Sequence, residues 1–360
     1  MKLISKNFHR RDGGPQVHRL RFSSTGLAAD DEGLSYSLLN FLDSVLRGIG
    51  QVMLQNNSYA GLLFLAGVFY NSPLFGSAVL LGTVVSTATA MMLGVERALV
   101  RAGLFGFNGG LVAIALLYFL QPDALTWGCV VFATACSTII MAAMLTLLDS
   151  WKLPVLTAPF VVTSFCFFLA TARFGRIQST HLLPTAGLPK AVTVEGVVTA
   201  STILEGAFNG IAQVFFQANV TTGIFFAVGL LVSSRMACAT ALAGSLTGLL
   251  VAWGMGAAEP AIRSGAFGFN SVLVAIAFGG VFFRLGKLSL AYTLFAATAT
   301  AFVFAALSAA LEPLGVPALT FPFVLVTWLF LLASPLFPQL RPPAAAEERL
   351  PEKKQALAAD

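Results

Sequence analysis

Charge is what this sequence has least of. Of its 360 residues only 10% are charged, whereas 57% are hydrophobic. A soluble domain usually carries about 25% charged residues, so this chain cannot cover its surface with charge. The shortage excludes an ordinary cytosolic enzyme, a nucleic-acid-binding protein and a disordered scaffold. The formal net charge is +5, and about half of the charged residues lie in the two terminal segments 1–35 and 341–360. This distribution is typical of membrane topology rather than of a nucleic-acid groove.

Metal-binding and redox side chains are scarce as well. The cysteines lie in apolar stretches without a C-x-x-C pair, which favours small buried hydrophobic residues over ligands. The three histidines lie in polar segments outside the apolar runs. We therefore expect no metal site, no cofactor and no histidine relay. The cysteines are Cys129, Cys136, Cys166 and Cys238, and the histidines are His9, His18 and His181.

What the sequence has instead is long uncharged runs. A helix needs about 20 apolar residues to cross a hydrocarbon core of roughly 30 Å, so the runs add up to about ten crossings. They lack the alternating polar pattern of barrel strands, which leaves helices as the spanning element. The sequence thus predicts an all-α polytopic membrane protein. The runs are 48–95, 102–122, 124–148, 153–172, 206–234, 236–258, 264–283, 288–311 and 313–340.

The chain also contains the same sequence twice, about 162 residues apart. Two apolar sequences can match by chance at Leu, Val and Ala, but not at Gln, Asn, Gly, Thr and Pro over such a length. We therefore infer an internal duplication. The matching pairs are GIGQVMLQNN at 48–57 with GIAQVFFQAN at 210–219, GLFGFNGGLVAIA at 103–115 with GAFGFNSVLVAIA at 265–277, and, with one extra residue, LPVLTAPF at 153–160 with VPALTFPF at 316–323.

Ten crossings shared by two halves give five crossings in each. An odd number predicts that the second half enters the membrane upside down, an architecture that places its site near the midplane between the repeats. The amphipathic stretches 36–51 and 191–213 are interpreted as re-entrant half-helices that begin the two halves. The predicted parts are a polar cytoplasmic segment 1–35, a first membrane repeat 36–172, a polar connector 173–190, a second membrane repeat 191–340 and a disordered tail 341–360.

The flanking charges predict the topology. The first 35 residues are polar and basic, without the apolar core and cleavage site of a signal peptide. Basic residues flank both ends of the hydrophobic region, so we expect both termini to be cytoplasmic. The protein is predicted to be a multi-pass protein of the cell membrane, which is the inner membrane if the source is bacterial.

Ionisable residues are missing from the middles of the runs. Asp43, Glu205, Arg101 and Arg263 lie mostly at the ends of the runs, where charged residues usually cap helices and anchor them at the interface. An enzyme would need nucleophiles, paired acids or metal ligands in a pocket. An ion-driven carrier usually keeps ionisable groups inside the membrane. The sequence therefore favours the passive movement of an uncharged solute.

Neutral polar residues and aromatic rings occur in the middles instead. Gln51 and Gln213 offer amide groups, and Thr157 and Thr320 each place a hydroxyl between two prolines. Pro frees carbonyl oxygens of the preceding turn, which is tolerable at membrane depth only along a cavity. The FGFN motif in both halves supplies flat rings that would form a narrow slot. A slot edged by acceptor oxygens suits a small, flat, neutral solute with many N–H donors, such as urea.

These motifs resemble the urea transporter family over about residues 36–340. The resemblance rests on QVMLQNN and QVFFQAN, on FGFNGGL and FGFNSVL, and on two Pro-containing segments. These segments, LPVLTAPF at 153–160 and VPALTFPF at 316–323, are called the first and second box. It implies two inverted halves, each of five transmembrane helices plus a re-entrant half-helix. It also implies a homotrimer in membrane lipid with one pore per subunit, which acts as a urea channel rather than a pump.

The resemblance implies a pore role for particular residues. Phenylalanine and leucine would wall an outer and an inner slot, the glutamines would stand at the slot edges as acceptors, and the threonines would meet in the narrow middle. Leu54 departs from the family, in which an aromatic residue is common at that position. The implied pore residues are Gln51, Leu54, Phe107, Leu111, Thr157, Gln213, Val214, Phe216, Phe269, Leu273 and Thr320.

Three alternatives remain open at this point. A channel for other small neutral amides or for ammonia would use the same scaffold, although ammonium channels usually rely on pore histidines. A proton-coupled urea or amide carrier would respond to a pH gradient. A membrane-embedded enzyme or lipid-binding protein would need a cluster of acids, His or Cys inside the membrane.

Overall fold

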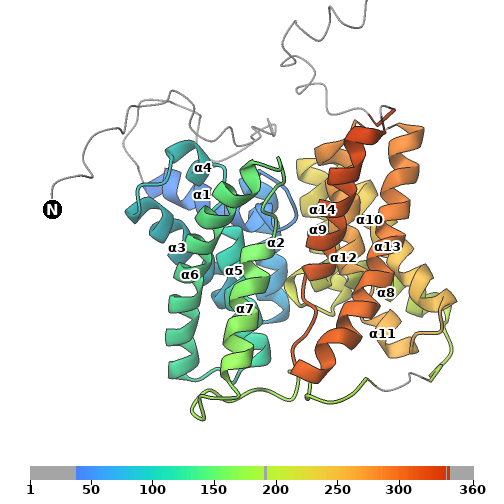
Figure 1. Cartoon of the computed structure of the whole chain (residues 1–360), viewed down its shortest axis with the longest axis horizontal. Coiled ribbons are helices and arrows are strands. Elements are labelled where there is room, and N and C mark those ends of the chain that lie inside the picture. The colour runs from blue at the N-terminus through green and yellow to red at the C-terminus, as the bar shows by residue number, and fades with distance from the viewer. Residues whose placement is uncertain (1–37, 190–192, 285, 338, 341–360) are drawn as a thin grey trace, which may run out of the picture.

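The computed structural model describes residues 38–189, 193–284, 286–337 and 339–340. The predicted segments 1–35 and 341–360 lie outside the described residues, as does Lys190 at the end of the connector. Across the described ranges the chain is helical and forms no strand, apart from one isolated bridge between Leu120 and Ser179. The all-α class predicted from the sequence is confirmed (Figure 1).

The helices of the first half precede the connector and those of the second half follow it. The first half contains α1 (Leu38–Gln51), α2 (Ser58–Asn71), α3 (Pro73–Met92), α4 (Arg97–Arg101), α5 (Phe107–Phe119), α6 (Ala124–Asp149) and α7 (Ala158–Ala170). The second half contains α8 (Ala200–Ala212) with η1 (Gln213–Phe215), α9 (Val220–Ser233), α10 (Arg235–Gly254), α11 (Glu259–Arg263), α12 (Phe269–Ile276) with the π-helix η2 (Ala277–Phe282), α13 (Lys287–Leu311) with η3 (Glu312–Leu314), and α14 (Phe321–Ala333) with η4 (Ser334–Leu336).

Matching residues of the duplication cap matching helices. The side chain of Asn57 accepts a hydrogen bond from the backbone at the start of α2, and Asn219 does the same for α9. Ser72 and Ser234 likewise cap α3 and α10. Asn and Ser are favoured at this position because their oxygen satisfies an N–H that has no partner within the helix. The repeated polar residues therefore explain why the same helix order occurs in both halves.

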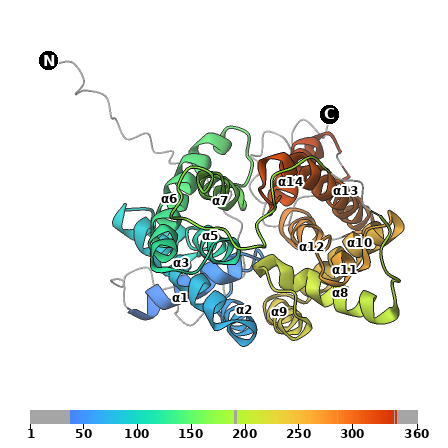
Figure 2. The ribbon, with the colours of Figure 1, turned by 90° about the horizontal axis from the view of Figure 1, so that it is seen from below.

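Two groups of helices lie side by side when the molecule is seen along its helices (Figure 2). The helices α2 and α9 pack against each other where the groups meet. Gly67 and Gly229 make this approach possible, because a side chain at either position would collide with a phenylalanine of the other half. The hydroxyl of Thr222 also donates to the carbonyl of Gly67 at 3.1 Å. The backbones of α2 and α9 therefore lie close together where the two halves meet.

Each half is also held together by glycine. Gly103 and Gly265 have φ values of +73° and +77°, a conformation that L side chains rarely adopt. The space beside them is filled by the backbone of Gly48 and Gly210, respectively. These glycines therefore allow the backbone of the half-helices α1 and α8 to lie directly against the turns that precede α5 and α12.

Fewer helices reach full membrane length than the uncharged runs predicted. By length and composition, four described helices are long and apolar enough to cross a membrane, at Pro73–Met92, Ala124–Asp149, Arg235–Gly254 and Lys287–Leu314. A fifth span arises if α8 with η1 is joined to α9 across a bend of 74°. The other apolar runs are interrupted by non-helical backbone, so that α2, α5 and α7 have only 13 or 14 residues, which is about 20 Å.

The first half-helix has its polar face turned inward. In α1 the side chains of Asp43 and Arg47 are buried, whereas Leu38, Leu39 and Leu42 are exposed. This is the reverse of a helix on a soluble domain, and it suits a helix whose outer surface meets an apolar phase.

Candidate functional site

The two Pro-containing boxes meet at the contact between the halves. The hydroxyl oxygens of Thr157 and Thr320 lie 2.6 Å apart and share one hydrogen bond, in which either can be the donor. Both side chains are almost completely buried. Residues 163 positions apart in the sequence thus come together, at the point where α7 and α14 begin. Their role in a pore remains a prediction.

The backbone just before each threonine is in an unusual conformation. Leu156 and Leu319 have φ values of +55° and +51°, in the left-handed region that non-glycine residues seldom occupy. Leu54 and Phe216, which follow the half-helices, have φ values of +61° and +58°. Backbone strain of this kind persists only where the surrounding structure imposes it, and it clusters at functional sites. Four of the five such non-glycine residues in the described ranges thus form two matched pairs, and the fifth, Lys152, directly precedes the first box.

Two asparagines hold the boxes in this conformation. Asn108, at the second residue of α5, donates to the carbonyl of Leu156 at 3.3 Å and accepts from the N–H of Phe160 at 3.1 Å. In the second half Asn270 donates to the carbonyl of Leu319 at 3.1 Å. It also accepts from the N–H of Phe323 at 3.1 Å. Each asparagine therefore satisfies one donor and one acceptor of an unwound, buried backbone.

This arrangement leaves the threonine hydroxyls available. A threonine at the N-cap normally accepts a hydrogen bond from an N–H in the first turn of its helix. Thr157 and Thr320 stand at the N-caps of α7 and α14, but neither makes such a bond. Asn108 and Asn270 take over the capping from another helix, and the two hydroxyls face each other. The sequence interpretation missed these asparagines as site residues, although each is the last residue of the repeated FGFN motif.

The two glutamines differ in their hydrogen bonding. The amide nitrogen of Gln51 donates to the carbonyl of Ala102 at 2.9 Å, which leaves its oxygen as the group that can accept from a solute. Gln213 opens the 3₁₀ turn η1 and is half-buried. In the part of the chain that the structure describes, the Gln213 side chain makes no hydrogen bond. Only Gln51 is therefore held with its acceptor oxygen in a fixed orientation.

The ring of Phe216 lies among aromatic residues of the other half. Phe216 belongs to the second half, but its ring lies 5.3 Å from that of Tyr118, 5.8 Å from Phe119 and 6.4 Å from Phe160, centroid to centroid. These three rings belong to α5 and α7 of the first half. Leu54 occupies the matching position in the first half and supplies no ring. Position 216 thus carries a ring among other rings, whereas position 54 carries an aliphatic side chain.

The remaining implied pore residues are deeply placed, but they do not all pair as the motif suggested. Phe107, Leu111, Val214 and Leu273 are buried. Phe269 is half-buried, and its ring packs on Phe304 at 5.6 Å. Over the described ranges, no ring contact joins Phe107 to Phe269. A slot between these two rings would therefore have to be wider than a direct stack.

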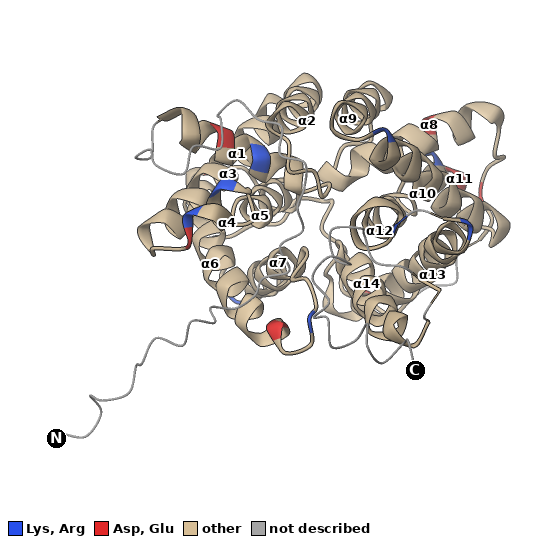
Figure 3. Ribbon diagram, turned by 90° about the horizontal axis from the view of Figure 1, so that it is seen from above, with Lys and Arg blue, Asp and Glu red and all other residues tan. Residues whose placement is uncertain are grey.

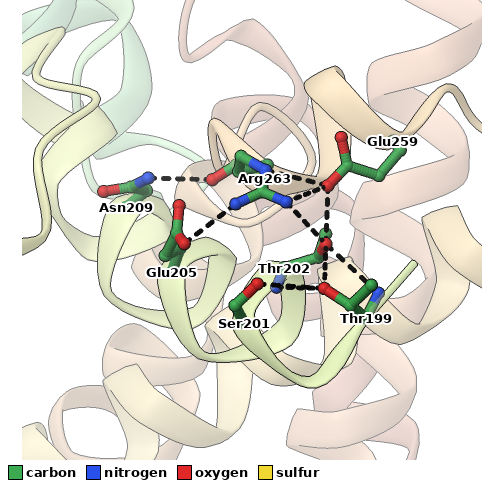
Figure 4. Close-up of polar contacts among 7 residues, drawn as sticks. All are labelled: Thr199, Ser201, Thr202, Glu205, Asn209, Glu259 and Arg263. Atoms are coloured by element: carbon green, nitrogen blue, oxygen red, sulfur yellow. Dashed lines mark hydrogen bonds and ion pairs between the residues drawn. The ribbon is translucent and has the colours of Figure 1, made fainter. Parts of the chain in front are cut away.

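Charged residues are few and lie mostly near the ends of the apolar runs, and Figure 3 marks their positions on the ribbon. In the second half, Arg263 of α11 pairs with Glu205 of α8 at 2.8 Å and with Glu259 at 2.7 Å. The Thr202 hydroxyl donates to Glu259, and Asn209 donates to the carbonyl of Arg263 (Figure 4). This network joins the first turns of α8 to α11, as expected for residues that anchor helix ends.

The same network shifts the pKa values of Glu259 and Arg263. The hydrogen bond from Thr202, followed by that from Arg263, holds the pKa of Glu259 below its ordinary value. The bonds to Glu259 and Glu205 raise the pKa of Arg263. In the first half, Arg47 pairs with Asp43 at 2.6 Å and donates to Asn56 at 2.9 Å. The counterpart of Arg47 in the second half is the neutral Asn209.

Replacing Asn108 by leucine should destabilise the protein. The change leaves the carbonyl of Leu156 and the N–H of Phe160 without their buried partner, at about 1–3 kcal/mol for each group. Thermal unfolding in detergent measures the effect. The control is Gln121→Leu, which removes the amide of an exposed side chain. Equal unfolding temperatures for N108L and Q121L would show that Asn108 does not support the box.

The network around Glu259 should make stability depend on pH. Because the folded pKa of Glu259 is depressed, its contribution is complete above the ordinary glutamate pKa and is lost as pH falls through the depressed value. The unfolding temperature of wild type should exceed that of Glu259→Gln near neutral pH, and the difference should vanish in strong acid. Glu195→Gln, at an exposed residue, serves as control. A difference that stays constant with pH would contradict the assignment.

Comparison with known proteins matches these motifs to one family. The family described as urea transporter matches residues 42–335. The chain is 33% identical over 299 residues to Urea transporter 1 of Rattus norvegicus, covering 82% of this chain and 77% of that protein. It is 32% identical over 321 residues to Urea transporter 1 of Ovis aries, covering 88% and 83%, respectively. The resemblance noted in the sequence is confirmed, and the chain belongs to the urea transporter family.

Proposed function

We propose that urea crosses this protein passively, down its gradient, by a route between the two halves. Membership of the urea transporter family, with relatives named Urea transporter 1, makes the chain a multi-pass membrane transporter of urea and not an enzyme. The route and its mechanism go beyond that membership. The observation that carries them is the buried contact between the hydroxyls of Thr157 and Thr320.

The contact between the two hydroxyls suits a narrow binding site for a small amide. With no solute present, each hydroxyl satisfies the other, so neither is left unpaired in an apolar interior. A hydroxyl can donate to a urea carbonyl and accept from a urea N–H. When urea arrives, the single hydrogen bond between the two threonines is replaced by hydrogen bonds to urea. The oxygen of Gln51 would supply a further acceptor. Phe216 and its neighbouring rings would exclude solutes that are not flat.

The placement of charge supports a passive route over a coupled one. Ion-driven carriers keep ionisable groups inside the membrane. The described helices that reach full span length contain Asp, Glu, Lys or Arg only at their terminal residues. The short apolar helices α5, α7, α12 and α14 contain none. Urea is the substrate supported by the family, and related small amides remain candidates for weaker passage.

We further propose that the repeats 36–172 and 191–340 lie inverted in the membrane. The short helix α4 lies toward the upper end of Figure 1, whereas its counterpart α11 lies toward the lower end. The bend of 74° between α8 with η1 and α9 suits a re-entrant half-helix, for which α1 would be the counterpart. Exposed apolar faces would meet lipid and, as in the resemblance, two further copies of the chain in a homotrimer. A native mass of one chain in lipid nanodiscs would contradict the trimer.

Replacing either central threonine by valine should depress urea flux, because each change removes a hydroxyl at nearly constant volume. Breaking one buried hydrogen bond to the solute is worth about a three- to tenfold loss. Stopped-flow light scattering on proteoliposomes under an inward urea gradient measures it. Fast entry by wild type without a pH gradient supports the passive route. Unchanged flux in both T157V and T320V would exclude the central binding site, and a requirement for a pH gradient would favour a coupled carrier.

The end that carries α4 should face the cytoplasm of the cell membrane. Arg97 and Arg101 belong to α4, and positive residues favour that side. Both α1 and the end of α14 lie toward the same end in Figure 1, so both termini would be cytoplasmic. In a chain without its native cysteines, Glu96→Cys should react with an impermeant maleimide only after lysis. Gln178→Cys, on the opposite connector, should react in intact cells, and the reverse pattern would overturn the orientation.

A further inference from the structure

Two buried hydroxyls in the molecule have no partner and occupy matching positions of the duplication. The oxygens of Ser164 on α7 and Thr327 on α14 make no hydrogen bond, and both residues are completely buried. Buried hydroxyls are nearly always bonded, and helical Ser or Thr usually bonds to the carbonyl one turn earlier. Of the unpartnered oxygens in the described residues, only these two form a repeat-matched pair. Thr87 and Thr163 have the apolar counterparts Leu249 and Val326, and Asn209 has Arg47. Thr126, at the third residue of α6, matches Ser289 of α13, which is hydrogen-bonded.

Both residues lie on the same face of their helix as a central threonine. Ser164 follows Thr157 by seven residues, and Thr327 follows Thr320 by seven. Seven residues make two helical turns, so each pair shares a face at a separation of about 10 Å. On α7 the opposite face, with Val162, Cys166 and Leu169, is exposed. Ser164 therefore points to the interior, in the direction in which Thr157 meets the other half.

The neighbours of Ser164 belong to the group of aromatic rings around Phe216. Phe160 and Phe168 lie one turn to either side of Ser164 on the same face. The ring of Phe160 contacts Phe216, and that of Phe168 contacts Phe119, which in turn contacts Phe216. Ser164 is thus the polar residue between two rings that line one side of the proposed route. The complete burial of Ser164 does not argue against a place along the route, because the implied pore residues Leu111 and Leu273 are equally buried.

The surroundings of Thr327 also place it at the contact between the halves. The next residue, Trp328, donates its indole N–H to the carbonyl of Pro154 in the first box at 2.7 Å. This turn of α14 is therefore held against the first half. Phe323, one turn before Thr327, is fully buried and is the residue whose N–H bonds to Asn270. Both hydroxyls consequently lie beside the boxes and not on an outer face.

We propose that Ser164 and Thr327 are additional binding groups for the permeating solute, one in each half. Each would donate to the carbonyl or accept from an N–H of a small neutral amide after it leaves the central threonines. Such a group explains a buried hydroxyl that is unpaired until the solute arrives. The proposal rests on the passive urea route argued above. If the halves are inverted, the four hydroxyls form one series that extends from the centre toward both sides.

The test compares urea permeability in proteoliposomes by stopped flow for Ser164→Ala, Thr327→Val and the double variant. Each single change should lower urea permeability about three- to tenfold, as expected for one lost hydrogen bond. The conservative changes Ser164→Thr and Thr327→Ser keep the hydroxyl and should keep the flux. Thr163→Val is the matched control, because Thr163 is equally buried and unpartnered but points to another side of α7 and has a valine as its counterpart.

The outcomes separate this proposal from the function on which it rests. Wild-type liposomes that admit no urea would defeat the proposed route itself. Rapid entry by wild type together with unchanged entry by S164A and T327V would overturn only the assignment of these two hydroxyls. Equal losses in T163V and S164A would do the same, because the effect would then follow from packing. Losses in S164A and T327V, with flux retained in S164T, T327S and T163V, would establish the two groups.

Discussion

The structure depends on one constraint: backbone that leaves the helical conformation inside an apolar interior must still have its hydrogen bonds satisfied. The two boxes are non-helical just before α7 and α14, where Leu156 and Leu319 adopt the left-handed backbone conformation. Water is the usual partner of such backbone, but here the partners are Asn108 and Asn270. Because each asparagine projects from a separate helix, the start of α7 is tied to α5 and the start of α14 to α12. Losing one amide would release both the box and the threonine that it presents.

The same constraint decides which polar residues can be spared for a solute. Capping by asparagine frees the threonine hydroxyls, and these find each other. Carboxylates and guanidinium groups instead form ion pairs with one another on α1, α8 and α11. Charged groups therefore tie helices to one another, whereas neutral groups would line the centre of the proposed route. This division suits transport of a neutral molecule, because an unpaired charge near the centre would hold water and ions.

The sequence predicted the family and the helical class because polar residues stood out against an apolar background. Gln, Asn, Thr and Pro recur in register, which indicated the duplication, and the family resemblance that they carry implied that Thr157 and Thr320 meet. The role of Asn108 could not be found this way, because its partners Leu156 and Phe160 lie about fifty residues further on. The lengths of the individual helices could not be predicted either. An uncharged run does not reveal where non-helical backbone, such as that around Thr157, shortens a helix.

The difference between Leu54 and Phe216 has a thermodynamic consequence. Phe216 stands among three rings, while Leu54 occupies the corresponding place in the first half. A duplicated protein that had remained symmetric would present the same affinity to a solute arriving from either side. Along the proposed route the unlike residues at positions 54 and 216 would skew the energy profile, so urea would rest longer on one side of the centre, and flux would saturate at different concentrations from the two faces. A passive route still stops at equal concentrations, whatever its skew, so the asymmetry tunes the kinetics and stores no gradient.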